Sequence, residues 1–366
     1  MSSLIDKQLD STPEYFNYKI EKNLGNVFKS YREIRAQKIS GSLYSSSHRF
    51  VIPKGIGYIA QMFIRNRISS SGDNSTANLQ TGSLIYKDVK LRTESGYILT
   101  SNSPEYIMSR IDDLPSTKKQ WALNAASPDQ TFNNNTVNCY TIPFFSIFEK
   151  SNNFYNTNNN EQLYLDVNVA DNYQSMGLVA GLDSLDPVLV VVSFVFHEGS
   201  VIPPNVTKKM LTYDNYTEKV RRIPLGARSF EIDIDCELNP FEVRVMALNQ
   251  FKNHHHIHKL TIVQDNINSV VMDRRTNFLL SNDNLEQSRS GAEPDGSVTS
   301  TLVYNFGVDN SRLYKTGTLP LSKHTWKLVV DFLEPVPDNN YEFYCIWSYF
   351  LPTIMGRLGD TRILFN

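Results

Sequence analysis

The chain contains 366 residues, with 36 Lys and Arg against 38 Asp and Glu and a formal net charge of −2. This near balance excludes a protein whose overall charge draws it to nucleic acid or to an anionic membrane. Aromatic residues make up 11% of the chain, which favours half-buried β-sheet surfaces over helical bundles.

Residues 1–40 are predicted to form an amphipathic helical arm. Thr12 and Pro13 give a good helix start, because Thr caps a helix N-terminus and Pro fits the first helical position. Apolar residues then recur at three- and four-residue spacing as far as Ile34, as on one face of a helix. The basic residues of the arm are Lys19, Lys22, Lys29, Arg32, Arg35 and Lys38.

Two roles fit such an arm, and a third does not. It could pack on the core like any amphipathic helix, or lie at a membrane surface with its basic residues near lipid phosphates. Its charge is too sparse for a nucleic-acid arm, so no sequence-specific nucleic-acid binding is expected. We therefore expect the arm to contact neighbouring subunits and a membrane surface.

The period of the apolar residues changes to two from about Arg49, which predicts a first β domain over residues 41–200. Gly, Asn, Ser and Pro residues separate the expected strands. These strands are residues 49–52, 57–67, 83–91, 97–100, 138–148, 162–169 and 188–196.

A second β domain is predicted over residues 223–366, after a linker at 201–222 that carries Pro203 and Pro204. Its expected strands are residues 229–237, 242–248, 258–263, 270–272, 278–281, 303–308, 325–332 and 341–350. Short strands without long helical patterns indicate an all-β chain. The predicted fold is two tandem eight-stranded antiparallel jelly-roll barrels with an N-terminal amphipathic helical arm.

The two halves also share a layout, which suggests a duplicated topology. Residues 97–110 and residues 278–289 both begin as a strand and run into a polar loop. Each half closes with an alternating strand followed by a continuous apolar strand, at 162–169 and 188–196 and again at 325–332 and 341–350.

One cluster could bind a metal ion, although the expectation is that no metal or other cofactor is bound. If residues 254–258 formed a strand, His254, His256 and His258 would share one face. No carboxylate or thiol flanks them to complete a structural site, so a polar loop or strand edge is the favoured interpretation.

A row of carboxylates is a candidate catalytic group. Glu231, Asp233 and Asp235 alternate along one expected strand, but a glycosidase needs two carboxyl groups that face one cleft. Their favoured role is the solvated side of a sheet whose other side is apolar. The chain also lacks the common nucleotide-binding and nucleophile motifs, and no enzymatic activity is expected.

This layout resembles the double jelly-roll major capsid proteins of icosahedral, lipid-containing bacteriophages of the FLiP-like kind. Three stretches carry the resemblance: Gly57-Tyr58-Ile59 at the start of a long strand, residues 84–97 with the turn Ser95-Gly96-Tyr97, and Gly317-Thr318-Leu319-Pro320-Leu321 before the two closing strands. The resemblance extends over nearly the whole chain.

The resemblance implies a homotrimer whose six jelly rolls form a pseudo-hexagonal capsomer of an icosahedral shell. Its partners would be neighbouring capsomers, minor capsid or penton proteins, and an internal membrane reached by the arm. The expected localisation is the virion. The first residues lack an apolar leader, and the longest apolar run, 187–196, is too short to span a membrane, which predicts synthesis in the host cytoplasm.

A second hypothesis keeps the same folds. A viral spike, or another two-domain β-sandwich protein that binds a receptor or a carbohydrate, would present exposed aromatic residues at one rim. The tryptophans Trp121, Trp326 and Trp347 are instead scattered along the sequence, and two of them lie in expected strands.

Overall fold

The computed structural model describes residues 27–74, 81–112, 137–143, 155–196, 210–236, 238–273, 301–306, 318–354 and 362–363. The chain divides into two compact units. The first unit comprises residues 1–107, 125–214 and 351–366, and the second comprises residues 108–124 and 215–350.

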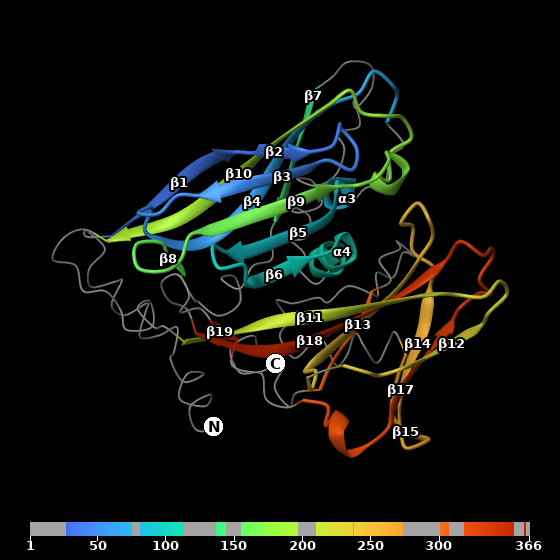
Figure 1. Cartoon of the computed structure of the whole chain (residues 1–366). Helices are drawn as coiled ribbons and strands as arrows, with labels where there is room; N and C mark the ends of the chain where they lie inside the picture. The colour runs from blue at the N-terminus through green and yellow to red at the C-terminus, as the bar shows by residue number, and fades with distance from the viewer. Residues whose placement is uncertain are drawn as a thin grey trace. The chain divides into compact units, whose positions relative to one another are not determined.

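Strands dominate the N-terminal half of the chain (Figure 1). In order, its elements are β1 (Val27–Arg35), β2 (Gln37–Ser40), β3 (Ser47–Ile52), β4 (Tyr58–Ser69), α3 (Thr81–Leu84), β5 (Tyr86–Thr93), β6 (Ile98–Asn102), α4 (Pro104–Asp112), β7 (Val137–Pro143), β8 (Tyr155–Asn156), β9 (Leu163–Val169), the 3₁₀ turn η2 (Gln174–Met176) and β10 (Ser184–Phe196). The predicted strand at 83–91 therefore begins later, because residues 81–84 form a helical turn.

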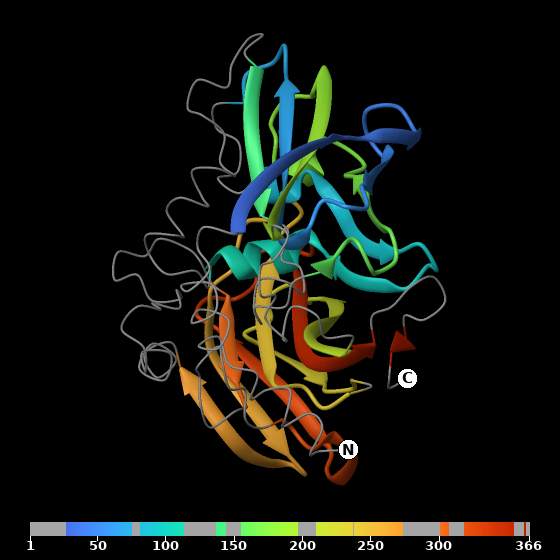
Figure 2. The same cartoon turned by 90° about the vertical axis from the view of Figure 1, so that its left-hand side faces the viewer.

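The C-terminal half is also built from strands. Its elements are β11 (Met210–Arg222), β12 (Ser229–Asp233), β13 (Glu242–Leu248), β14 (Ile257–Gln264), β15 (Ile267–Asp273), β16 (Leu302–Asn305), the 3₁₀ turn η4 (Leu321–Lys323), β17 (Trp326–Phe332), β18 (Glu342–Ile354) and β19 (Arg362–Ile363). Figure 2 shows the orange hairpin of β14 and β15 beside the orange-red β17, with which β14 pairs in antiparallel register. The predicted strand at 278–281 lies outside the described residues.

The same strand order occurs twice. One sheet has the order β1-β10-β4-β7, and its counterpart has β11-β18-β13-β16. The other sheets run β3-β9-β5-β6, with β2 added beside β3, and β12-β17-β14-β15. The short strands β2, β8 and β19 are additions to these sheets, and without them each half has eight strands. In chain order, the first, eighth, third and sixth of these strands form one sheet, and the second, seventh, fourth and fifth form the other. This is the order of a jelly roll, so the predicted double jelly roll is confirmed.

Alternation along the strands builds each core. In β9, Leu163, Leu165 and Val167 are buried, whereas Tyr164 and Asp166 between them are partly exposed. Successive strand residues point to opposite faces, so one face of the sheet is apolar and the other polar.

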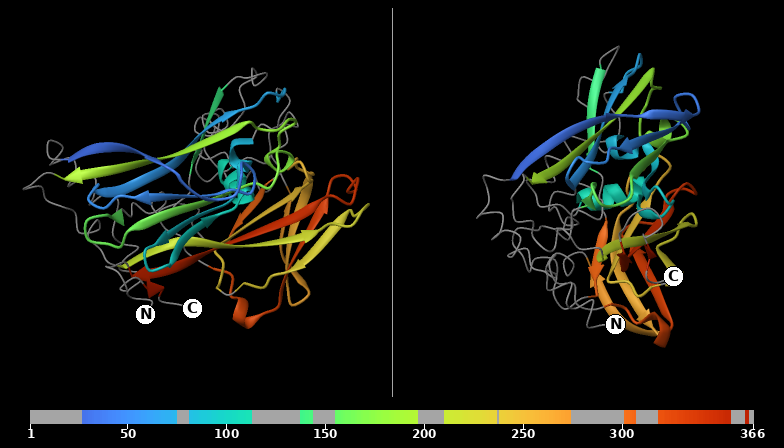
Figure 3. Two further views of the ribbon diagram at one scale, coloured as in Figure 1. Left: turned by 45° about the horizontal axis from the view of Figure 1, so that its top comes forward. Right: turned by 60° about the vertical axis from the view of Figure 1, so that its left-hand side comes forward.

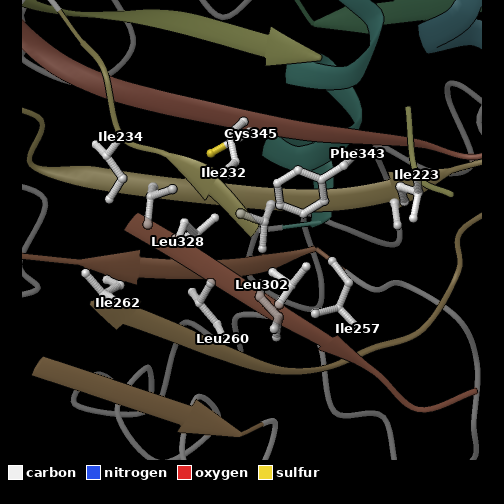
Figure 4. Packing of buried hydrophobic residues seen from close by; sticks show 14 of the residues in the cluster. Ile223, Ile232, Ile234, Ile257, Leu260, Ile262, Leu302, Leu328, Phe343 and Cys345 are labelled. Carbon is white, nitrogen blue, oxygen red and sulfur yellow. The ribbon is translucent and has the colours of Figure 1, made fainter. Parts of the chain in front are cut away.

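The core of the second jelly roll draws residues from both of its sheets (Figure 4). Phe343 and Cys345 come from β18, whereas Leu260, Ile262 and Leu328 come from β14 and β17. These side chains are fully buried, and burial of each large apolar side chain stabilises the fold by roughly 1.5–3 kcal/mol.

The helix predicted over residues 27–40 is wrong, because these residues form β1 and β2. Lys29, Arg32 and Arg35 lie in β1 and Lys38 lies in β2. β1 pairs along its whole length with β10, and nine backbone positions matched to an apolar strand outweigh a short helical periodicity. The start of the predicted arm, with Lys19 and Lys22, lies outside the described residues.

A strand also occupies much of the segment predicted as a linker. β11 covers residues 210–222 and forms the edge of a sheet beside β18. β1 and β11 have equivalent places, since each is the first strand of its jelly roll. Both are polar strands at a sheet edge, where few side chains need to be apolar.

The repeated layout is confirmed at the closing strands. β9 and β10 occupy the same places in the first jelly roll as β17 and β18 in the second. Residues 97–110 were predicted to run from a strand into a polar loop. The strand is present as β6, but it leads into helix α4 instead of a loop. Ser103 starts this helix, with its hydroxyl accepting a hydrogen bond from the backbone N–H of Tyr106.

Candidate assembly surface

The basic residues of β1 and β2 are exposed, but they do not form one basic face. Lys29 and Arg35 share one face of β1, and Arg32 lies on the other. A helix at a membrane surface needs its basic residues on a single side. No helix among the described residues is long and apolar enough to cross a membrane.

β1 is a terminal strand of its sheet within the described residues (Figure 3, dark blue, beside the yellow-green β10). Its single acidic residue, Glu33, forms an ion pair of 2.9 Å with Arg65 of β4. Arg32 and Arg35 have no ion pair or hydrogen bond to any residue that the structure describes. The open edge of β1 therefore keeps a positive charge.

Apolar side chains accompany this charge. Tyr31 is 61% exposed, and Ile39 of β2 is 53% exposed. The Nζ atom of Lys29 lies 5.3 Å from the centroid of the Tyr31 ring, within the range of a cation–π interaction. Exposed apolar residues among charges are typical of protein contact surfaces.

β12 is an open edge of the opposite sign. It is the terminal strand of its sheet within the described residues, with β17 as its partner there. Glu231 and Asp233 are exposed on one face, and the exposed Asp235 follows directly. Lys327 Nζ lies 2.6 Å from Glu231, and Lys219 Nζ lies 3.1 Å from Asp235. Asp233 has no ion pair with any described residue.

The predicted role of this carboxylate row as the solvated side of a sheet is confirmed. The residues between the carboxylates face the core: Ile232 and Ile234 are each 8% exposed and belong to the buried cluster. Phe230 packs against the same cluster, with its ring centroid 5.4 Å from that of Phe343.

The outward face of the β3-β9-β5 sheet carries a polar network that the sequence did not predict. Asp166 accepts hydrogen bonds from Arg49 Nε at 2.7 Å and from Arg92 Nε at 2.6 Å. Both guanidinium groups also lie over the ring of Tyr164, at 5.7 Å and 4.7 Å. Burial raises the pKa of Asp166, but the hydrogen bonds and charges of Arg49 and Arg92 outweigh it and hold this pKa below its usual range.

A buried ion pair was also missed. Arg244 Nε lies 2.8 Å from a carboxylate oxygen of Glu242, and the two side chains are 0% and 3% exposed. Arg244 also donates a hydrogen bond of 3.1 Å to the backbone carbonyl of Ser109 in α4, and the Ser348 hydroxyl donates one of 3.3 Å to Glu242. The available signal was two charges at alternate positions of a strand whose other residues are apolar.

The histidines do not form a row on a strand. β14 begins at Ile257, so only His258 lies within it, and it is exposed. His254 forms a bridge with Leu248 before the strand. The backbone carbonyl of His256 accepts a hydrogen bond from Leu333 N. No three His, Cys, Asp or Glu side chains in the described ranges are grouped so that they could hold a metal ion.

Two tryptophans belong to the core rather than to a rim. Trp326 is 8% exposed and Trp347 is fully buried, both in the core of the second jelly roll. Trp121 lies outside the described residues. Trp326 and Trp347 therefore cannot form part of an exposed aromatic surface that binds a receptor or a carbohydrate.

Comparisons with known proteins support the fold. No protein-family model matches the chain, and no curated protein sequence matches it. The solved capsid structure of the virus PBCV-1 is similar over 93% of this chain and 97% of the other, with 9% identity and a TM-score of 0.70.

Two further solved structures are similar. The major capsid protein of Faustovirus matches over 90% of this chain and 91% of its own, at 8% identity and a TM-score of 0.65. The mavirus major capsid protein matches over 97% and 95%, at 10% identity and a TM-score of 0.52. At these identities the likeness establishes a shared fold.

Proposed function

We propose that the chain is the major capsid protein of an icosahedral virus. The observation that carries this proposal is that the same order of eight strands occurs in both halves of one chain. The coverage of the similar capsid structures supports it, because the likeness spans nearly the whole length of both chains.

Duplication gives a simple route to a hexagonal building block. A homotrimer of a chain with two jelly rolls contains six of them, so three copies can occupy the corners of a hexagon. Hexagonal blocks tile a surface, and closed rotational symmetry is the common solution for assemblies of one chain. Neighbouring capsomers and minor capsid or penton proteins would complete the shell.

The proposed setting is a virion, with the chain made in the host cytoplasm. We include an internal membrane beneath the shell, as in the FLiP-like group. Lys19 and Lys22 precede β1, and contact between this first part of the chain and the membrane remains part of the proposal. Lys29, Arg32, Arg35 and Lys38 are assigned to contacts between copies, since their strands present them on more than one face.

The proposed role is structural and needs neither a cofactor nor catalysis. Glu231 forms an ion pair with Lys327, and Asp235 forms one with Lys219. Such pairs are common among carboxylates on the solvated side of a sheet. Burial raises the pKa of Cys236 to about 12, so this thiol is a poor nucleophile at neutral pH. The alternative of a spike or carbohydrate-binding protein is less well supported, because Trp326 and Trp347 are buried.

The oligomeric state tests the proposal. We expect the purified full-length chain, measured by light scattering after size exclusion, to have three times the mass of one 41.8 kDa chain. Dilution should leave this mass unchanged over the micromolar range. A stable monomer or dimer throughout that range would contradict the proposed function.

A further inference from the structure

We propose that the basic edge of β1 in one copy lies against the acidic edge of β12 in a second copy. This inference rests on the proposed function and names the surfaces through which the copies meet. Both strands are terminal in their sheets within the described residues. A terminal strand has one row of backbone N–H and C=O groups without a partner strand, and such edges readily pair with another chain.

The charges of the two edges are complementary. On the β1 side, Lys29 and Arg35 lie on the outward face, because Ile34 on the other face is half-buried whereas Lys29 and Arg35 are exposed. On the β12 side, Glu231 and Asp233 lie outward, because Ile232 between them faces the core. The outward faces of the two edges therefore carry opposite charges.

The charges within one copy are not fully balanced, which leaves some available to a partner. The Glu33 carboxylate forms an ion pair of 2.9 Å with Arg65 of β4, so it does not neutralise the arginines of β1. On the outward faces, Arg35 of β1 and Asp233 of β12 have no ion-pair partner in the described parts of the chain. Cross-strand pairs of opposite charge stabilise a pair of strands, and like charges destabilise it.

The same charges disfavour incorrect pairings. Two copies of β1 would bring basic residues together, and two copies of β12 would bring carboxylates together. Like charges that face each other across an interface cost several kcal/mol and so select against wrong partners. Of these three pairings, the contact of β1 with β12 is the one that brings opposite charges together.

The first jelly roll shows that a strand fits at this edge. β3 occupies the place in the first jelly roll that β12 occupies in the second, and β2 pairs with the outer edge of β3. No strand within the described ranges pairs with the corresponding edge of β12. That edge has the place and the charge to receive a strand from another copy.

The contact is heterologous, since each copy contributes β1 to one neighbour and β12 to the other. Contacts of this kind close into a ring when the rotation between copies divides a full turn. Three copies joined in this way would alternate first and second jelly rolls around the ring, as the hexagonal block requires.

Reciprocal charge reversal tests the pairing. We would measure the mass of the full-length chain and of the variants K29E/R35E, E231K/D233K and the combination of all four substitutions, all of them at the outward-facing positions of the two strands. Each double variant should weaken trimer formation by roughly 100-fold or more, because like charges then face each other. The combination restores opposite charges in exchanged positions and should recover most of the trimer.

A control variant, K54E/K87E, makes the same change in net charge as the double variant of β1, but on exposed lysines outside β1 and β2, and it should remain trimeric. Far-ultraviolet circular dichroism would check that each variant is folded. If both double variants stay trimeric like the wild type, or if the combination fails to recover the trimer, the edge pairing is overturned. A wild-type chain that is monomeric would overturn the proposed function itself.

Discussion

Glu242 and Arg244 have opposite charges at positions where the surrounding strand is apolar and fully buried. A buried ion pair does not by itself raise stability much, since both charges lose their hydration. Loss of one partner is costly, because the other charge stays buried without compensation. The hydrogen bonds from Ser348 to Glu242 and from Arg244 to the Ser109 carbonyl show that this network is built around both charges.

The substitution Arg244→Met should lower the free energy of unfolding by roughly 3–5 kcal/mol, because the Glu242 carboxylate remains buried without its cation. Urea denaturation followed by tryptophan fluorescence measures the change, since Trp326 and Trp347 lie in the core of the same jelly roll. The double variant E242Q/R244M should recover part of the loss. Equal losses in the single and double variants would show that the charge is not the cause.

Asp166 gives the first jelly roll a dependence on acid. Its pKa in the folded protein lies below the pKa in the unfolded chain, so its contribution to stability is present above the unfolded value and is lost as the pH falls through the folded value. At neutral pH, Asp166→Asn should cost roughly 1 kcal/mol, and this difference should begin to shrink as the pH falls below about 4 and be lost below the folded-state pKa of Asp166.

Urea denaturation at several pH values measures this effect. The matched control is Asp186→Asn, which removes an exposed carboxylate that has no ion pair within the described residues. A constant difference between wild type and Asp166→Asn across the acid range would contradict the role assigned to the arginine pairs.

Individual side chains were predictable where alternation alone decides their orientation. The solvated side of β12, with Glu231 and Asp233, follows from its sequence. The partners of Asp166 do not, because Arg49 and Arg92 are 117 and 74 residues away along the chain. Only the pairing of β3 and β5 with β9 brings these three residues together.

At the scale of elements, the first strand of each jelly roll was the hardest to recognise. β1 has apolar residues at helical spacing and β11 is largely polar, because an edge strand with an exposed face has little need for alternation. β9 and β17, each between two strands of its sheet, alternate clearly and were predicted almost to the residue. Sequence patterns therefore report how deeply a strand lies in its sheet.

Truncation distinguishes a first strand from a dispensable arm. Removal of residues 1–26 should leave β1 in place and the chain soluble. Removal of residues 1–38 deletes β1 and opens the edge of β10, whose residues Val188 to Val192 are all apolar. Such an edge is a template for aggregation, so this variant should be insoluble or should aggregate during size exclusion. Equal solubility of both truncations would contradict the place of β1 in the sheet.

At the scale of the whole molecule, the fold class was predictable from the sequence, but the order in which the strands pair was not. Many short strands and two halves with the same closing strands led to a double jelly roll. The order of strands in each sheet depends on which distant segments pair, and short local patterns do not specify that. The two open edges of opposite charge appeared only once the strand order placed β1 and β12 at the ends of their sheets.

The most direct test of a capsid role is an image of the purified assembly. Averaged electron micrographs of the full-length chain should show particles with threefold symmetry and a nearly hexagonal outline made of six similar lobes. Each lobe corresponds to one jelly roll, so three chains account for all six. Particles with two lobes, or with a symmetry that does not place six jelly rolls in a ring, would contradict the central claim.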